Sequence, residues 1–419
     1  MPRTETPGTD SHRRWIVFSM ISVIYFFVYF HRVSTSVIAA DLLAAFQTHA
    51  TALGIMSSMY FYLYAFEQPL VGYFTDRIGP RRVIAYWSLA AAAGCALFGL
   101  APDIGWATAA RALIGIGVGG VYVPAMKALS LWYRQDKFPM MIGLLMSVGN
   151  FGAIIATTPL AWVAGTWGWR PTFFLIAAIT LVLAFATLVL TRDHPGSAAD
   201  TRPKNVPGEA AGQNAKSNRA RVLASRQFWI VAVIFFGIYG PLITLQGLWA
   251  TPFLMTVLGI EHIFASKLNM LIPIGVIAGA PMIGWLFNRF GLDKRKTLIT
   301  ILLVYTLTWL VIVSGVHTTT SLAATFVIMG FVGGGFVSTL WGLVRDTTPP
   351  ELMGLASGLL NIAPFIGIAF FQVLTGMFLD RVGTTAGLYP AAGFQNAFLA
   401  CLAGIVICLG LSFAIRNRA

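Results

Sequence analysis

The sequence predicts an all-α membrane protein with twelve membrane-spanning helices arranged as two pseudo-symmetric six-helix bundles. Of the 419 residues, 57% are hydrophobic and only 10% are charged, whereas soluble domains carry about 25% charged residues. Apolar runs recur along the whole chain, and each reaches the roughly 18 residues needed to cross a hydrocarbon core of about 30 Å. An internal repeat divides these runs into two sets of six.

The helices are expected where the apolar runs lie: near 15–42, 51–74, 83–100, 106–132, 138–163, 171–191, 228–257, 268–287, 297–316, 321–344, 354–378 and 394–415. The one long hydrophilic stretch follows the sixth run and has the composition of a flexible linker. The predicted organisation is therefore a tail at 1–14, a first bundle at 15–191, a central loop at 192–226, a second bundle at 227–415 and a tail at 416–419.

The repeat is visible in two motifs. The segment Gly72–Arg82 (GYFTDRIGPRR) has a counterpart that begins at Gly284 (GWLFNRFG) and includes Arg289. The second match pairs four residues of the first half with four of the second at a constant offset. It joins Gly143, Asn150, Gly165 and Arg170 with Gly354, Asn361, Gly376 and Arg381. Two nearly equal offsets indicate two homologous halves.

The distribution of basic residues predicts the orientation. With an even number of spans both termini share one side, and the loops on that side hold most of the arginines and lysines. The opposite loops carry only Arg170, Lys267 and Arg381. By the positive-inside rule both termini are cytoplasmic. The net charge of +13 is then a topology signal, and its scatter over short loops argues against nucleic-acid binding.

The sequence argues against an enzyme. It has no nucleotide-binding Gly-Lys-Ser/Thr loop, no metal-ligand cluster and no large soluble domain, and we expect no cofactor. Cys95, Cys401 and Cys408 lie in apolar runs without metal-ligand spacing. The first 14 residues are polar and precede a long span, so no cleaved signal peptide is expected. The chain is predicted to be a multi-pass protein of a bacterial inner membrane and a monomer.

Charged residues inside apolar helices are the candidate functional groups. Arg32, Arg111 and Lys127 are three such cations, with Glu67 as the one deep carboxylate. Each charge costs about 2.5–3.5 kcal/mol to insert, so such residues usually handle substrate, ions or protons. The positive excess predicts an anionic cargo. The alternative is that some of them snorkel to the surface or pair structurally.

Helical spacing outlines a site in the first half. Tyr25, Tyr29, Arg32 and Ser36 form one stripe on the first helix, and the planar guanidinium suits a carboxylate. The alternative is plain helix packing. On the fourth helix, Arg111 and Lys127 point about 160° apart unless Pro124 bends the chain, so which of them joins Arg32 stays open.

The second half offers uncharged polar groups. The candidates for binding substrate hydroxyls or an apolar body are Tyr239 and Gln246, Ser338 and Trp341, and Asn361. Hydrogen bonds between helices would explain the same residues. Charge recognition is thus expected in the first half and shape recognition in the second.

The chain resembles the major facilitator superfamily over essentially its full length, and two motifs carry the resemblance. Gly72–Arg82 is similar to that family's loop signature between helices 2 and 3. Arg111, followed by Gly115, Gly117 and Gly119-Gly120, is similar to its helix 4 signature. The resemblance implies two bundles that rock around a central site, with Asp76, Arg77 and Arg289 in gating loops that brace the outward-open state.

Shorter motifs resemble the organic-anion and sugar-phosphate permease branch: Tyr29–Arg32, Tyr64 with Gln68-Pro69, and Pro349–Gly358. In that branch an arginine at the position of Arg32 binds the anionic group. Many relatives have Asp where this chain has His31, several have Glu at Val118, and phosphate antiporters have an arginine that Tyr239–Trp249 lacks. A carboxylate is therefore favoured over a phosphorylated sugar. A sugar-phosphate carrier, a sensor of the same fold and drug efflux remain alternatives.

Proton symport is the expected energy source. Glu67 and His31 are the candidate carriers, because a buried carboxylate and an imidazole both change charge in response to their surroundings. The resemblance places Arg111 in the coupling machinery. The structural alternative is a Glu67–Lys127 pair that holds two helices together.

Overall fold

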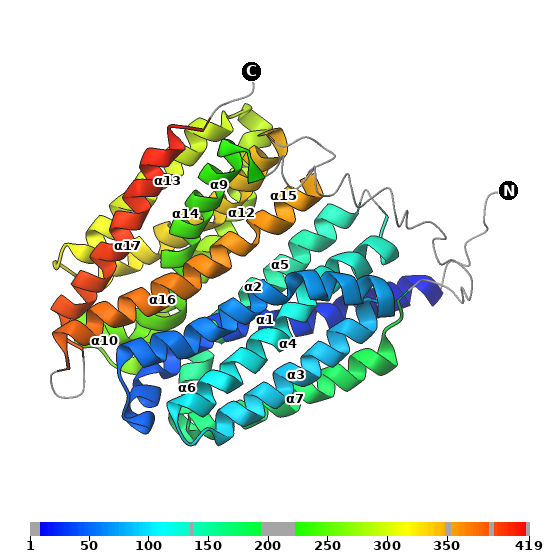
Figure 1. Ribbon diagram of the computed structural model, residues 1–419, viewed down its shortest axis with the longest axis horizontal. Coiled ribbons are helices and arrows are strands. Elements are labelled where there is room, and N and C mark those ends of the chain that lie inside the picture. Colours follow the sequence, from blue (N-terminus) through cyan, green and yellow to red (C-terminus); the bar gives the residue numbers. More distant parts are fainter. Residues whose placement is uncertain (1–8, 135–136, 194–222, 348–352, 385–388, 416–419) are drawn as a thin grey trace.

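The computed structural model describes residues 9–134, 137–193, 223–347, 353–384 and 389–415 (Figure 1). The first half contains α1 (Thr9–Phe46), α2 (Ala50–Ile78), α3 (Pro80–Leu100), α4 (Ile104–Trp132), α5 (Phe138–Ile155), α6 (Thr158–Trp167) and α7 (Trp169–Leu190). The second half contains α9 (Arg226–Thr244), the π-helical turn η1 (Leu245–Trp249), α10 (Ala250–Leu258), α11 (His262–Asn269), α12 (Leu271–Phe290), α13 (Lys294–Val313), α14 (Thr319–Thr347), α15 (Met353–Leu360), α16 (Ile362–Val382) and α17 (Ala391–Ser412).

The described residues form helices and no strands, which confirms the predicted all-α class. Among them, ten helical segments are long and apolar enough to cross a membrane, and α5 with α6, bent by 41°, brings the number to eleven. The remaining long helix of the first half is α2, with 29 residues. This helix is long enough to cross a membrane. Its composition is less apolar than that of the ten segments, and it carries Glu67, Asp76 and Arg77. The first helix begins at Thr9, earlier than the apolar run.

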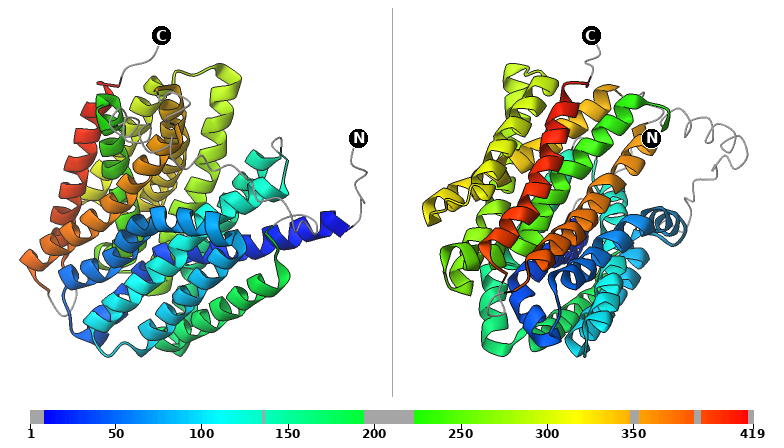
Figure 2. Two further views of the ribbon diagram at one scale, coloured as in Figure 1. Left: turned by 45° about the vertical axis from the view of Figure 1, so that its right-hand side comes forward. Right: turned by 60° about the vertical axis from the view of Figure 1, so that its left-hand side comes forward.

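The two halves form two bundles that lie side by side (Figures 1 and 2). Within the bundles, α2 packs along α4, and α12 packs along α14 in the same way. Between the bundles, α2 packs on α16 and α12 packs on α5. This exchange of partners is what a twofold relation between homologous halves produces.

Small residues bring the first-bundle helices into backbone contact. A Cβ added at Gly115 would lie 2.4 Å from the Tyr60 carbonyl oxygen, and one at Gly117 would lie 2.2 Å from the Ala91 nitrogen. Close approach at glycines is typical of membrane helices, which lack a hydrophobic driving force between them. The backbone of α4 leaves helical geometry at Gly120, because Pro124 has no N–H for the Gly120 carbonyl.

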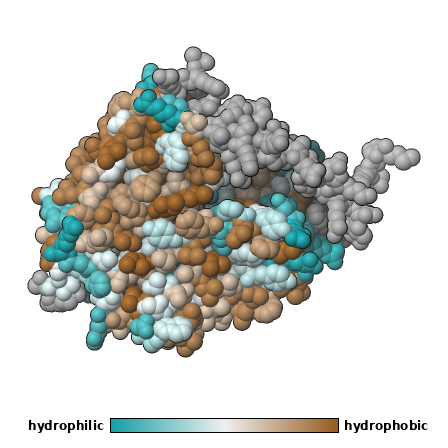
Figure 3. Space-filling view, viewed as in Figure 1, coloured by the Kyte–Doolittle hydropathy of each residue, from teal (hydrophilic) through white to brown (hydrophobic). Residues whose placement is uncertain are grey.

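The outer surface is apolar. Large hydrophobic side chains such as Phe66, Leu70 and Trp285 are more than half exposed. Figure 3 shows hydrophobic residues across the middle of one face and hydrophilic ones near its edges. An apolar surface of this kind is suited to contact with lipid hydrocarbon. The helices also satisfy their own backbone hydrogen bonds, as the membrane interior requires.

Contacts between the bundles gather on one side. The side where α1 begins and α17 ends is called here the terminal side, and the side where α1 ends and α2 begins is called the distal side. Among pairs of described residues, the side-chain hydrogen bonds between the bundles concentrate in the distal half. The bonds join Ser36 to Thr251 and Asn269, Val37 to His262, and Ala50 and Thr51 to Asp380 and Tyr389.

Candidate substrate-binding site

A cavity of about 350 Å³ lies between the two bundles. This volume is at the lower end of the range for small-molecule sites. The first bundle contributes Tyr25, Tyr29, Arg32, Tyr64, Tyr122, Val123 and Met146, and the second contributes Phe235, Tyr239, Val337, Trp341, Gly358, Asn361, Pro364 and Phe365. Arg32 is the only charged residue among these described lining residues.

Arg32 is buried against aromatic rings. Its guanidinium carbon lies 4.4 Å from the ring centroid of Tyr29, 5.3 Å from that of Phe365 and 5.6 Å from that of Tyr64. The hydroxyl groups of Tyr60 and Tyr239 also contact the guanidinium. Cation–π contacts of this kind stabilise a desolvated arginine by about 2 kcal/mol.

No carboxylate neutralises this cation. Within the described part of the chain, Arg32 has no acidic partner, and its Nε atom is buried without a hydrogen-bond acceptor. A buried charge without a counter-ion is costly unless something else pairs with it. The arrangement therefore favours an anion in the cavity.

The helix 1 stripe divides between two tasks. Tyr25, Tyr29 and Arg32 line the cavity, with both tyrosine hydroxyls directed at the Met146 sulfur, 3.4 and 3.8 Å away. Ser36 lies further toward the distal side, where it bonds to Thr251 across the bundle boundary. One face of α1 thus both lines the cavity and closes it.

Only some of the residues predicted in the second half line the cavity. Tyr239, Trp341 and Asn361 line the cavity. Ser338 instead donates a hydrogen bond to the Ala280 carbonyl of α12. Gln246 is buried in the turn η1, where its backbone carbonyl accepts a bond from Asn269. Neither is among the lining residues.

The other two cations, the buried Arg111 and the partly exposed Lys127, have protein partners. Lys127 contacts the Asp76 carboxylate at 2.5 Å and the Thr75 carbonyl at 3.3 Å, at the terminal end of α2. Arg111 directs two N–H groups at the His31 carbonyl, each at 3.2 Å, and stacks on Tyr60. Neither residue lines the cavity, and each binds an acceptor within the first bundle.

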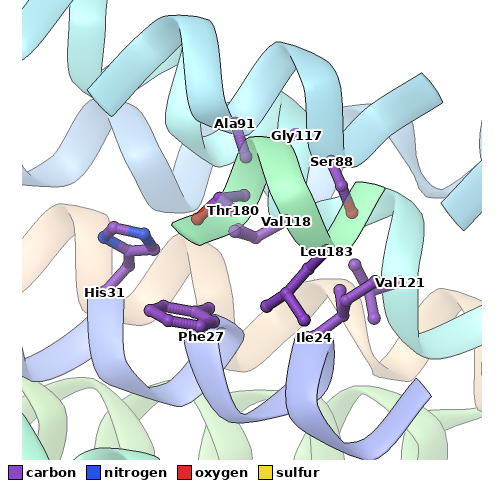
Figure 4. A pocket seen from close by; sticks show the side chains of 10 residues that line it. All are labelled: Ile24, Phe27, His31, Ser88, Ala91, Gly117, Val118, Val121, Thr180 and Leu183. Atoms are coloured by element: carbon purple, nitrogen blue, oxygen red, sulfur yellow. The ribbon is translucent and has the colours of Figure 1, made fainter. Parts of the chain in front are cut away.

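His31 lies in the core of the first bundle. Its Nε2 atom is 3.6 Å from the Cys95 sulfur, and its ring packs on Phe173. Beside it is a cavity of about 10 Å³, lined also by Ser88 and Thr180 (Figure 4). The His31 Nδ1 and Ser88 Oγ atoms lack partners, and the space is about that of one water molecule.

Glu67 lies at the meeting point of α2, α3 and α4. The Trp87 indole N–H donates to Oε2 at 3.0 Å, whereas Oε1 is buried without a partner. Gly119 leaves room for this carboxylate, since a Cβ there would lie 1.7 Å from Oε1. The suggested Glu67–Lys127 pair is wrong, because Lys127 binds Asp76.

The predicted gating residues make contacts inside their own bundles. Asp76 binds Lys127, Arg77 donates to the Tyr73 hydroxyl, and Arg289 stacks on Phe290. None of these contacts crosses the bundle boundary. Together with the distal contacts, this describes a molecule that is held closed on the distal side.

Several lining residues were not among the predicted ones. Tyr122, Met146, Phe235 and Phe365 belong to this group. Phe235 is four residues before Tyr239, so helical spacing could have identified it. Tyr122 directly follows the bend of α4 at Gly120, and helical spacing alone does not predict the direction of a side chain beyond such a bend.

Known proteins are similar to this chain in sequence and in fold. The sequence profile of the Major Facilitator Superfamily matches residues 21–372. A "probable sulfoacetate transporter" of Cupriavidus necator is 23% identical, over 88% of this chain and 88% of that protein. A "probable galactarate/D-glucarate transporter" of Escherichia coli is 22% identical, over 84% of this chain and 85% of the relative.

The fold has a match among solved structures. A bacterial homologue of the human lysosomal transporter Spinster, in an inward-facing, unoccupied conformation, has a TM-score of 0.76. It is 18% identical, and the match covers 98% of each chain. The family profile spans most of this sequence, and the two bundles have the arrangement that the internal repeat predicts. This chain is a transport protein that belongs to the Major Facilitator Superfamily.

Proposed function

We propose that this protein is a secondary active transporter that moves a small organic carboxylate across the membrane by alternating access, with proton symport. The observation that carries the proposal is Arg32, a buried cation without a carboxylate partner in the cavity between the bundles. The names of the relatives, which specify organic acids, support an anionic cargo.

The orientation proposed from the basic loops makes the terminal side cytoplasmic. The distal contacts then hold the outside closed, so the cavity belongs to an inward-facing state. In the outward-facing state these contacts would separate, and Asp76, Arg77 and Arg289 would meet across the boundary. The substrate would stay bound at Arg32 while the bundles rock around it.

Glu67 is the proposed proton carrier. It has one donor, Trp87, and no cationic partner in the described part of the chain, so it can gain or lose a proton without breaking an ion pair. Arg111 and His31 connect the neighbouring helices, because the guanidinium of α4 holds the His31 carbonyl of α1. This link would transmit a local change at α4 to the helix that carries Arg32.

A thermal-shift screen of organic acids tests the proposal. The purified protein should be stabilised by carboxylates, since a ligand that binds only the folded state raises its melting temperature. Arg32→Ala should abolish the shift, whereas Arg13→Ala, which removes an exposed cation of the same helix outside the cavity, should preserve it. A shift that survives Arg32→Ala would overturn the assignment. Uptake of the best ligand into proteoliposomes then distinguishes a transporter from a sensor, which binds without accumulation.

A further inference from the structure

The cavity has one positive charge and a wall of aromatic rings, and this combination narrows the substrate class. Eight of its fifteen described lining residues are aromatic. We propose, resting on the transport function above, that the substrate is an aromatic monocarboxylate, with its carboxylate on Arg32 and its ring between the aromatic side chains of both bundles.

The charge balance limits the substrate to one anionic group. Arg32 is the single cation in the described lining. Arg111 is held by the His31 carbonyl and Lys127 by Asp76. A second carboxylate would find no cation in the described lining to pair with it, and an unpaired buried charge is strongly unfavourable.

The rings favour a planar apolar body. Tyr64 of α2 and Phe365 of α16 lie 4.4 Å apart between ring centroids, beside the guanidinium. On the second-bundle wall, Phe235 contacts Trp341 at 6.0 Å and Tyr239 at 5.9 Å, both edge to face. Further aromatic pairs in these geometries add favourable contact energy beyond the burial of area.

Most polar groups of the described lining are phenol hydroxyls on aromatic rings, from Tyr25, Tyr29, Tyr64, Tyr122 and Tyr239. Besides the tyrosine hydroxyls, the described lining has one amide, Asn361, and no carboxylate, serine or threonine. The hydroxyls of Tyr25 and Tyr29 are directed at the Met146 sulfur. A sugar acid would leave water without replacing most of its hydrogen bonds, which lowers affinity. The substrate class thus differs from those named for the two relatives.

Titration calorimetry on the full-length protein, with four matched probes, tests this inference. Phenylacetate should bind at least about tenfold more tightly than 1,4-phenylenediacetate, which adds a charge, and than galactonate, which keeps one carboxylate and replaces the ring by hydroxyls. Phenylacetamide, which lacks the charge, should not bind measurably. Tighter binding of galactonate or of 1,4-phenylenediacetate would overturn the inference and leave an anion transporter in place. Anion binding unaffected by Arg32→Ala would instead overturn the proposed function.

A pair of tryptophan variants tests the role of the wall. Trp341→Leu should weaken phenylacetate binding about tenfold, because it removes the ring that faces the cavity. Trp285→Leu is the control, since Trp285 is on the outer surface of α12 and 58% exposed; it should change affinity less than about twofold. Melting temperatures check that both variants fold. Equal affinity of Trp341→Leu and wild type would show that this wall does not contact the ligand.

Discussion

Arg32, Arg111 and Lys127 each place one positive charge in an apolar helix, and the partner that each finds separates their roles. Within the described part of the chain, Arg32 contacts aromatic rings and faces the cavity. Arg111 meets a backbone carbonyl, and Lys127 meets a carboxylate. The sequence identified all three as unusual. It could not assign their partners, because these depend on how α4 bends at Gly120 and rotates against α1 and α2.

Lys127 provides the first prediction at this scale. Because its ammonium group binds Asp76 outside the cavity, Lys127→Ala should leave the affinity for the best organic acid within about twofold of wild type. Calorimetry on the purified variant measures this. A loss of affinity as large as that of Arg32→Ala would place Lys127 at the substrate instead.

Glu67 provides the second prediction at the scale of the residue. Glu67→Gln keeps the Trp87 hydrogen bond but cannot carry a proton. It should abolish accumulation driven by an imposed pH gradient while it preserves substrate exchange at equal pH. Proteoliposome assays measure both. Loss of both activities together with a lower melting temperature would show a structural role for Glu67 in place of a coupling role.

At the scale of the element, the contacts between neighbouring helices depend on glycines. Gly117→Ala should destabilise the protein by at least about 1–3 kcal/mol, because the Cβ would collide with the backbone of α3 at Ala91. Gly143→Ala is the control, since nothing lies within 4 Å of that position. It should be neutral or slightly stabilising. Similar melting temperatures for the two variants would contradict the packing described for α3 and α4.

The start of α2 is capped by the other bundle. Its N-cap residue, His49, makes no capping bond with its side chain. Instead Asp380, at the end of α16, accepts from the Ala50 and Thr51 amides at 2.8 Å and from the Tyr389 hydroxyl at 2.7 Å. Burial and the bond to Asp380 raise the pKa of Tyr389, so this hydroxyl remains a donor at neutral pH. A carboxylate also suits the positive end of a helix.

This cap must break when the distal side opens. Asp380→Ala should therefore shift the equilibrium toward the distally open state by about 1 kcal/mol, about fivefold in the ratio of the two states. Distances between spin labels on Trp167→Cys and Val316→Cys, both highly exposed, report the opening. Asp103→Ala is the matched control, since Asp103 caps α4 within its own bundle. An equal shift in both variants would contradict a latch between the bundles.

At the scale of the molecule, the fold followed from hydropathy and the repeat. The site followed only in part. Tyr25, Tyr29, Arg32, Tyr239, Trp341 and Asn361 line the cavity as their helical faces indicated, whereas Ser338 and Gln246 are used by neighbouring helices. Spacing along one helix identifies a face. Which neighbour covers that face is decided by contacts between distant segments, and the cap by Asp380 is such a contact.

The proposed topology is a whole-molecule prediction. A cysteine at the exposed position Arg82, on the terminal side, should react with an impermeant thiol reagent only from the cytoplasm. A cysteine at Gly105, on the distal side, should react only from outside. The three native cysteines are buried and give little background. Labelling of the Arg82→Cys variant in intact cells would show that the orientation is the opposite of the proposed one, and that the cavity faces the outside.

The central claim is that the anion binds at Arg32, and paired binding and uptake measurements on Arg32 variants test it most directly. Arg32→Lys keeps the charge but loses the planar pair of donors, so affinity for the carboxylate should fall at least about tenfold. Arg32→Ala should lose both binding and uptake while retaining the wild-type melting temperature within a few degrees. Normal affinity and normal uptake by a folded Arg32→Ala variant would contradict the account.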